Sequence, residues 1–293
     1  MAGMRLEFAQ FGDFDSLDIL RSSNPMNVEA LPSPLVAGLS TMYYIDTTVI
    51  EDETYYYRAR VWRDGVSLVS DEVRAKAKII DEYWGSVATL LHFDGGLTDE
   101  AGHIFTSNGA TNFDTGVFGQ CAIFTGNNYI FTLNGNDFDF LLGDFTVEQF
   151  VKFTGLPSNN VYAIAGNYAN NDGWVFQLRD DEGEGSRLRF SIGDNKFTDR
   201  AWTPSLNTWY HLVATRQNGL VYIFVNGILL VGPSVLADNI QATTGNTLNI
   251  GALKYTSSVI QYFKGSVDEL RITKGVARYT ENFTPPDGPF LSN

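Results

Sequence analysis

Hydrophobic and polar residues alternate along most of the chain in short runs. In TYYYRARV (residues 54–61), Tyr55 and every second residue up to Val61 share one face, and the residues between them share the other. The run WYHLVATR (209–216) alternates in the same way. Because successive side chains of a strand point to opposite faces, this pattern predicts half-buried β-strands. No segment sustains a 3.6-residue period, so we predict an all-β protein.

Turn-forming residues separate these runs. Asn226-Gly227 lies between LVYIFV and ILLV, and Asp64-Gly65 precedes VSLV. Both pairs favour the tight turns whose twist matches antiparallel strands, so we predict hairpins at both positions. The closing TENFTPPDGPFLSN (280–293) contains prolines, which cannot donate ladder hydrogen bonds. We expect this segment to wrap along the sandwich, because its prolines can lie over an edge of a sheet.

A short junction, KAKIIDEYWGS (76–86), separates two groups of strands. It has no Gly/Ser or Pro run of the kind that makes a long flexible linker. With 293 residues, 44% of them hydrophobic, the chain is long enough for two packed domains. We predict domains at residues 1–78 and 85–293, coupled semi-rigidly by residues 79–84.

The charge balance makes nucleic acid a poor candidate partner. The chain has 34 acidic and 20 basic residues and a net charge of −14. Such a chain repels a phosphate backbone, and no basic stripe with interleaved aromatic residues is present in the sequence. The single cysteine, Cys121, rules out an intrachain disulfide. It alternates with Ile123 in an apolar run, which predicts a small buried thiol.

No targeting or membrane segment is expected. The first 18 residues hold one Arg and four acidic residues, without an apolar run of signal-peptide length. No stretch approaches the roughly 18 consecutive apolar residues of a membrane helix. We therefore expect a protein made without an export signal and without membrane insertion.

Common catalytic patterns are also missing from the sequence. There is no Gly-x-Ser-x-Gly motif, and His92, His103 and His211 are scattered, without the spacing of a zinc site. The densest acidic cluster, residues 180–184, is interrupted and followed by glycines, which indicates a hairpin tip with solvated carboxylates. We expect no enzyme and no catalytic residues, and a glycoside hydrolase that has lost its motifs is the minor alternative.

Several segments, taken in order, resemble a known family. They are LLHFDGGLTDEAG (90–102), FGQCAIFTGNNYI (118–130), FTVEQFVKF (145–153), NTWYHLVATRQNGLVYIFVNGILL (207–230), NTLNIGAL (246–253) and GSVDELRITKGVARYTENFTPP (265–286). Together they resemble laminin G-like, concanavalin A-like jelly-roll domains over roughly the last two-thirds of the chain. The resemblance implies an antiparallel sandwich in which the first and last segments lie side by side. The ending DELRITKGVARYT, followed by Pro285 and Pro286, is most similar to the variant common in bacteriophage particle proteins.

The N-terminal segments resemble the last strands of a fibronectin type III domain. YYIDTTVIEDE (43–53) is similar to a strand end and a corner, and Tyr55 stands where the hydroxyl of the family ties down that corner. LDILRS (17–22) is similar to the central strand, although little chain precedes it. The resemblance implies a short fibronectin type III-like sandwich over residues 1–78.

The resemblance also implies one structural calcium ion and no other cofactor. Asp94 follows the first strand of this domain and Asp268 opens the last strand, and acidic residues at these places often hold an ion in the family. Carboxylate oxygens with loop carbonyls suit calcium. The alternative is that Asp268 caps a strand and Asp94 starts the Gly95-Gly96 turn through local hydrogen bonds. The sequence leaves both interpretations open.

Glycan binding by such folds uses aromatic faces that stack on sugar rings and polar loop side chains that bind hydroxyls. Trp174 alternates with Phe176 as a core strand residue would, whereas exposure and burial are equally expected for Trp202. None of the candidates marks a sugar type. The candidate ligand-binding residues of three loops are Tyr168, Asn170 and Asp172; Asn195, Arg200 and Trp202; and Tyr255 and Tyr262.

These expectations combine into one functional hypothesis. The resemblance implies a non-enzymatic, lectin-like adhesion or decoration protein on the surface of a bacteriophage particle, in its tail, fibre or capsid. Its partners would be other virion proteins and host cell-surface polysaccharide. It would bind them as a homo-oligomer or in a multicopy assembly. The alternative is a purely structural virion or surface protein whose jelly roll contacts other proteins.

Overall fold

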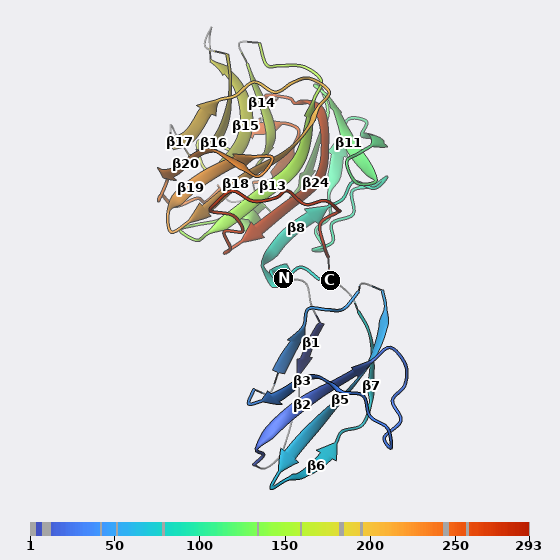
Figure 1. Cartoon of the computed structure of the whole chain (residues 1–293). Coiled ribbons are helices and arrows are strands. Elements are labelled where there is room, and N and C mark those ends of the chain that lie inside the picture. The colour runs from blue at the N-terminus through green and yellow to red at the C-terminus, as the bar shows by residue number, and fades with distance from the viewer. Residues whose placement is uncertain are drawn as a thin grey trace. The chain divides into compact units, whose positions relative to one another are not determined.

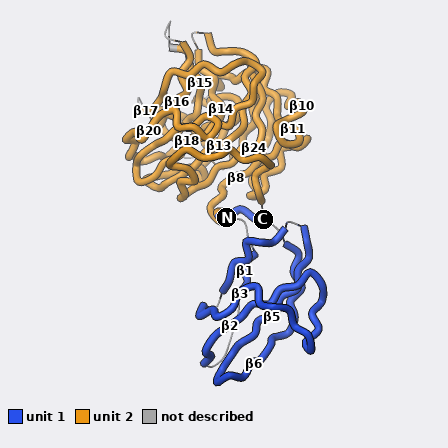
Figure 2. Tube along the Cα trace, viewed as in Figure 1, with its two compact units in different colours: residues 1–82, 293 blue, residues 83–292 orange. Residues whose placement is uncertain are grey.

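The computed structural model divides into two compact units, residues 1–82 and 83–292 (Figure 2). The division lies within the junction between the two groups of strands. In the described part of the chain the regular elements are β-strands and two 3-10 helices, η1 (Trp84–Ser86) and η2 (Gly135–Phe138), which confirms the all-β prediction. No helix among the described residues is long and apolar enough to span a bilayer. The described residues are 4–7, 13–41, 43–50, 52–77, 80–133, 135–158, 160–181, 185–193, 196–242, 246–255 and 258–292.

The first unit contains a five-stranded sheet and a separate pair of strands (Figure 1). Its buried hydrophobic core is small and is built mainly from β2 and β5. The strands of the sheet are β3 (Pro34–Leu39), β2 (Ser16–Ser22), β5 (Thr54–Arg63), β6 (Val66–Val69) and β7 (Val73–Lys76), and the pair is β1 (Met4–Glu7) with β4 (Tyr43–Asp46).

The period of two over residues 54–61 places alternate side chains of β5 in this core. Tyr55 and Tyr57 are buried, and Ala59 and Val61 pack against the same cluster. The Tyr55 hydroxyl accepts a hydrogen bond from the backbone N–H of Ile50 at 3.0 Å, as the resemblance to a tyrosine corner implies. The fibronectin type III-like assignment of the whole unit stays a prediction.

The second unit is a sandwich of an eight-stranded and a seven-stranded antiparallel sheet (Figure 1). The eight-stranded sheet contains β10 (Asn112–Thr115), β11 (Gln120–Thr125), β24 (Lys264–Lys274), β13 (Phe145–Phe153), β18 (Trp209–Gln217), β19 (Leu220–Val225) and β20 (Ile228–Val235) in spatial order, with β8 (Val87–Leu91) also paired to β24. The seven-stranded sheet has the order β17 (Lys196–Ala201), β16 (Gly185–Ile192), β15 (Trp174–Asp181), β14 (Val161–Gly166), β21 (Leu248–Ile250), β12 (Tyr129–Thr132) and β9 (Thr106–Asn108). A separate hairpin joins β22 (Leu253–Tyr255) to β23 (Ser258–Ile260).

The first and last segments of this unit pair as the resemblance implied. Leu91 of β8 lies opposite Leu270 of β24 in an antiparallel register. The predicted hairpin at Asn226-Gly227 is also present, between β19 and β20, and both turn residues have a positive φ, of 50° and 74°. A type I′ turn requires this left-handed backbone at both central positions. The turn predicted from local residues and the strand pairing implied by the resemblance are therefore both present.

The core lies between the two sheets and is rich in aromatic side chains. Trp174 is fully buried, and its ring stacks on those of Phe140 and Phe190 with centroids 5.3 and 5.8 Å apart. Cys121 is buried as predicted, and burial raises the pKa of its thiol. Apolar area removed from water is the main stabilising contribution of such a core.

The C-terminal segment, residues 276–292, covers the outer face of the eight-stranded sheet, as its prolines predicted. In Figure 1 it is the dark red strand-free segment that crosses β18 and β13. The N–H of Phe283 donates to the Gly227 carbonyl at 2.9 Å, and Phe290 is buried against Phe150 of β13. This face of the sandwich is therefore covered by the chain itself.

Candidate functional site

The outer face of the seven-stranded sheet carries an open groove of about 270 Å³. Alternate residues of β15 and β16 point into the core, so the residues between them form the floor of the groove. On β15 these are Val175, Gln177 and Arg179, and on β16 they are Arg189 and Ser191. The groove is thus built on regular strands, which hold side chains in place better than free loops do.

Two walls rise from this floor. Leu253, Tyr255 and Ile260 belong to the β22–β23 hairpin, and Lys196 and Phe197 begin β17. Tyr255 and Phe197 are 37% and 44% exposed, which is unusual for aromatic side chains in a fold with a large aromatic core. The groove therefore presents aromatic surface from both walls. The other described residues that line it are Tyr168, Gly193 and Gln261.

A tight turn beside the groove fixes two of its tyrosines. Ala169 and Asp172 exchange backbone hydrogen bonds, and the two asparagines between them have positive φ values of 50° and 68°. The side-chain oxygen of Asn171 accepts hydrogen bonds from the hydroxyls of Tyr168 and Tyr255, at 3.3 and 3.2 Å. Each ring is therefore tethered at its hydroxyl end.

Polar groups of the floor are held in defined positions as well. The Gln177 amide donates to the Ser191 hydroxyl at 3.2 Å. Gln261 contributes a buried carbonyl oxygen, Oε1, that accepts no hydrogen bond from the described residues. A buried acceptor without a donor costs about 1–3 kcal/mol, and a ligand or water hydroxyl would offset that cost.

Two arginines of β16 share one carboxylate. Arg187 donates to Asp199 Oδ1 at 3.1 and 2.8 Å, and the Arg189 Nε–H donates to Asp199 Oδ2 at 2.6 Å. Partial burial alone would raise the pKa of Asp199, but the hydrogen bonds and charges of the two guanidinium groups outweigh it and lower that pKa. The Arg189 guanidinium also lies 3.6 Å from the centre of the Phe197 ring. The planar guanidinium group of Arg189 is therefore held over the face of the Phe197 ring.

The structure brings some of the predicted ligand-binding residues together at this groove. Tyr168 and Tyr255 line it, and Asn170 and Asp172 are exposed in the turn beside them. Tyr262 is not among the lining residues, and its ring contacts that of Tyr129 at 6.2 Å. Of the eight candidates, Tyr168 and Tyr255 therefore line the groove, and their role in ligand binding stays a prediction.

Two candidate residues of the second predicted loop, Arg200 and Trp202, do not line the groove. Arg200 lies opposite Leu188 in the ladder, and therefore on the face of the sheet that is turned away from the groove. Trp202 is half-buried, because its ring packs edge-on against Phe153 and Tyr210. Asn195 lies outside the described residues.

Sequence reasoning missed the floor and the second wall. Gln177, Arg189, Ser191 and Phe197 occur at outward positions of three successive strands, and the period of two was a usable signal for them. That signal separates the two faces of a strand but does not say which face carries a groove. The pairing register supplies this information.

Asp94 and Asp268, the predicted calcium ligands, accept hydrogen bonds from the first residue of β11 and from the loop that precedes it, respectively. Asp94 Oδ1 accepts the N–H of Gln120 at 2.6 Å, and Asp268 Oδ2 accepts those of Val117 and Phe118 at 2.7 and 3.1 Å. Burial raises the pKa of Asp268 to about 7, and its other oxygen, Oδ1, is buried without a hydrogen-bond partner among the described residues.

These contacts bear on both interpretations of the two aspartates. Their hydrogen bonds to backbone N–H groups resemble a purely structural role, whereas the free Oδ1 of Asp268 suits a cation ligand. Within the described ranges, no group of three or more His, Cys, Asp or Glu side chains is arranged to hold a metal ion. Calcium binding at Asp94 and Asp268 stays a prediction.

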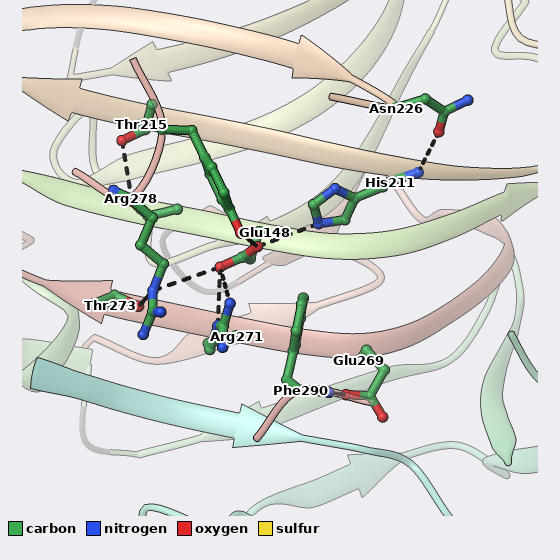
Figure 3. Close-up of polar contacts among 11 residues, drawn as sticks. Glu148, His211, Thr215, Asn226, Glu269, Arg271, Thr273, Arg278 and Phe290 are labelled. Atoms are coloured by element: carbon green, nitrogen blue, oxygen red, sulfur yellow. Dashed lines mark hydrogen bonds and ion pairs between the residues drawn. The ribbon is translucent and has the colours of Figure 1, made fainter. Parts of the chain in front are cut away.

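A buried ion-pair cluster lies on the covered face of the eight-stranded sheet (Figure 3). Glu148 of β13 is fully buried, and Arg271 of β24 donates to its Oε1 at 2.9 and 2.8 Å. His211 Nε2 lies 3.3 Å from Oε2, and the Tyr279 hydroxyl donates to the same oxygen at 3.2 Å.

The electrostatics of this cluster stabilise the ionised form of Glu148. Burial alone would raise the pKa of Glu148, but the charge of Arg271 and the contact with His211 lower it to about 2. Tyr279 and Phe290 of the C-terminal segment lie against the cluster. It therefore fastens that segment to the sheet and is closed to a ligand.

The chain is similar in fold to a number of solved structures. Domain 4 of AbnA, a GH43 extracellular arabinanase from Geobacillus stearothermophilus solved with arabinotriose, is 20% identical with a TM-score of 0.52, and the match covers 66% of this chain and 94% of that one. The binding domain of Paraclostridial Mosquitocidal Protein 1 is 14% identical with a TM-score of 0.51, covering 67% of this chain and 50% of that one. Among curated proteins, none matches the sequence.

A laminin G family model, described as the concanavalin A-like lectin/glucanases superfamily, matches residues 124–280, which is more than half of the chain. The matched range includes β13 to β24 and all the described residues that line the groove. The two-sheet sandwich agrees with this match. The chain therefore belongs to the concanavalin A-like lectin/glucanases superfamily and has its lectin-like jelly-roll fold.

Proposed function

We propose that the second unit binds carbohydrate in the groove between the β22–β23 hairpin and β17. The observation that carries this proposal is the combination of exposed aromatic walls, Tyr255 and Phe197, with a polar floor. Sugar rings present C–H faces that pack on aromatic rings, and their hydroxyls need hydrogen-bonding partners. Gln177, Arg189 and Ser191 offer such partners at the floor.

A structural neighbour supports this proposal by analogy. Domain 4 of the arabinanase AbnA was solved in complex with arabinotriose, and it has the same type of fold. Fold likeness alone does not identify a ligand, because one fold carries many sites. The groove residues of this chain therefore carry the proposal, and the neighbour adds only that the fold is suitable for a saccharide.

We further propose that the groove binds a saccharide without hydrolysing it. Glycosidases use two carboxyl groups that flank the scissile bond, at about 5 Å for retention or 6.5–9.5 Å for inversion. None of the described residues that line the groove is Asp or Glu. This supports a binding module, and incubation of acidic and neutral polysaccharides with the protein should release no reducing ends.

The biological setting that we propose is attachment of a bacteriophage particle to host polysaccharide. It rests on the resemblance of the C-terminal ending to phage particle proteins. A shallow site with few aromatic side chains gives weak affinity, in the millimolar to high micromolar range, for one copy. Many copies on a particle surface would raise the effective affinity. In this arrangement residues 1–78 contact the particle and the jelly roll is displayed.

The proposal can be tested with the full chain displayed on multivalent beads and applied to a glycan array. We expect binding to a subset of saccharides, and Tyr255→Ala should weaken that binding about tenfold, the equivalent of 1.4 kcal/mol. Tyr222→Ala is the matched control, because Tyr222 lies on β19 in the other sheet. Arrays that stay blank with multivalent display would favour the structural alternative, in which the jelly roll contacts proteins.

A further inference from the structure

A second group of aromatic side chains lies on the outer face of the seven-stranded sheet, outside the groove. Tyr129 and Phe131 belong to β12, where they flank Ile130, which is buried in the core. Successive side chains of a strand point to opposite faces, so Tyr129 and Phe131 point outward. Their ring centroids are 5.6 Å apart, and the Tyr262 ring contacts that of Tyr129 at 6.2 Å. We call Tyr129, Phe131 and Tyr262 the β12 aromatic cluster.

Packing of the core does not account for this cluster. Among the described residues, none of its three side chains belongs to the hydrophobic core clusters or packs against them. Each of the three residues is half-buried, so part of its surface stays accessible to solvent. Rings that hold one another in place lose little side-chain entropy when a ligand binds. The cluster therefore offers a preformed apolar surface.

Neutral polar groups lie beside these rings. In the ladder between β12 and β9, Asn108 stands directly opposite Tyr129, and Thr106 stands directly opposite Phe131. Residues that are opposite each other in antiparallel strands share a face, with Cβ atoms about 4.5–5.5 Å apart. Both polar residues are exposed, and neither they nor the cluster residues are charged. The surface thus combines aromatic faces with amide and hydroxyl groups.

We propose that the β12 aromatic cluster is a second saccharide-binding site, which takes a neutral sugar ring. The C–H face of a pyranose would pack on Tyr129 and Phe131, while its hydroxyls bind the side chains of Asn108 and Thr106. The absence of a charged side chain from these residues favours a neutral sugar. This inference extends the proposed carbohydrate-binding function to a separate place on the jelly roll, so each site can be tested without the other.

The two sites share one face of one sheet. The strand order places β14 and β21 between β12 and β15, whose residues form part of the groove floor. Neighbouring strands are about 4.8 Å apart, so β12 lies about 14 Å from β15. Gln261 lines the groove, and Tyr262, the next residue, belongs to the cluster. Two weak sites on one face would strengthen binding to a polysaccharide surface through effective concentration.

The test follows the amide chemical shifts of the isotope-labelled full chain. The probes are neutral trisaccharides built from glucose, galactose, mannose or N-acetylglucosamine. We expect at least one probe to shift two separate groups of resonances, one at Thr106, Asn108 and Tyr129 and one around Tyr255. Tyr129→Ala should weaken binding at the first group about tenfold and leave the second group unchanged.

Tyr222→Ala is the matched control for Tyr129→Ala. Tyr222 is also half-buried and also contacts a ring of its own strand, that of Phe224, but it lies in the other sheet. It should leave both groups of shifts unchanged. If Tyr129→Ala does not fold, Asn108→Ala, at an exposed position of the edge strand β9, replaces it and should weaken the same group of shifts.

The outcomes separate this inference from the proposed function. Shifts around Tyr255 alone would overturn the second site and leave binding in the groove intact. Shifts at Thr106, Asn108 and Tyr129 alone would support the second site and overturn the groove. No shift in either group would overturn both.

A protein partner is the competing occupant, because Leu133, two residues after Phe131, is 72% exposed. Sedimentation of the full chain tests this for a second copy. A dimer that both Tyr129→Ala and Leu133→Ser weaken, without saccharide shifts at the cluster, would overturn the inference. A monomer with those shifts, which Leu133→Ser leaves unchanged, would support it.

Discussion

At the scale of single residues, Glu148 shows how this fold keeps a charge in its interior. An ionised carboxylate without partners would lose several kcal/mol of hydration on burial. Arg271 and His211, together with the Tyr279 hydroxyl, surround it and replace that hydration. Removing one partner of such a buried pair destabilises more than the pair itself stabilises, because the other charge is left behind.

We predict that Glu148→Gln lowers the free energy of unfolding by roughly 3–5 kcal/mol at pH 7. The wild type should also lose stability relative to this variant in acid. The folded-state pKa of Glu148, about 2, lies below the ordinary value of 4.5, so its contribution is present above pH 4.5 and is lost as the pH falls toward 2. Urea unfolding between pH 7 and 2 measures both effects.

The control for this prediction is Glu100→Gln, since Glu100 is exposed. It should change the stability by less than about 0.5 kcal/mol at each pH. A difference between wild type and Glu148→Gln that is the same at pH 6 and pH 2 would show that folding does not lower the pKa of Glu148.

Asp268 is the residue at which the calcium prediction can be tested. If an ion binds its free Oδ1, calcium should raise the melting temperature of the wild type and a chelator should lower it, because a ligand of the native state stabilises by mass action. Asp268→Asn should abolish that difference, and Asp114→Asn, at an exposed position, should preserve it. Identical melting curves with calcium and with chelator would contradict calcium binding at Asp268.

At the scale of secondary-structure elements, the turn of the β19–β20 hairpin contacts the C-terminal segment at Gly227. Gly227 has a φ of 74°, and a Cβ atom at this position would clash with the carbonyl oxygen of Phe283. The turn therefore serves two purposes. It closes the hairpin, and its Gly227 carbonyl binds the N–H of Phe283 in the segment that covers the sheet.

We predict that Gly227→Ala destabilises the second unit clearly more than Gly275→Ala does. Both glycines have a left-handed backbone, with φ of 74° and 85°, but a Cβ atom on Gly275 meets open space. The control should cost about 1–2 kcal/mol for its backbone strain alone, and Gly227→Ala should cost that strain plus the displacement of the C-terminal segment. Thermal unfolding of both variants decides the comparison, and equal losses would contradict the role of the contact.

The elements also show how far the sequence could lead. Period-two runs and turn residues identified the strands of β5 and β18 and the hairpin at Asn226-Gly227, because these signals are local. The family resemblance added the pairing of β8 with β24. Of the residues that line the groove, the sequence singled out only Tyr168 and Tyr255. Arg189 faces it and Arg200 does not, although both belong to neighbouring strands, and only the register that pairs Arg189 with Asp199 shows which residues share its face.

At the scale of the whole molecule, one face of the jelly roll is covered and the other carries the groove. The C-terminal segment seals the outer face of the eight-stranded sheet, whereas the seven-stranded sheet presents aromatic and basic side chains to solvent. Contact of a saccharide with this groove, repeated over many copies, would combine weak single sites into attachment.

The most direct test is a crystal structure of the full chain with the saccharide that binds best on the array. The account predicts a sugar ring packed on Tyr255 or Phe197, with a sugar hydroxyl within hydrogen-bond distance of Gln177 or Ser191 at the floor of the groove. A saccharide bound at another place on the jelly roll, with this groove empty, would contradict the central claim.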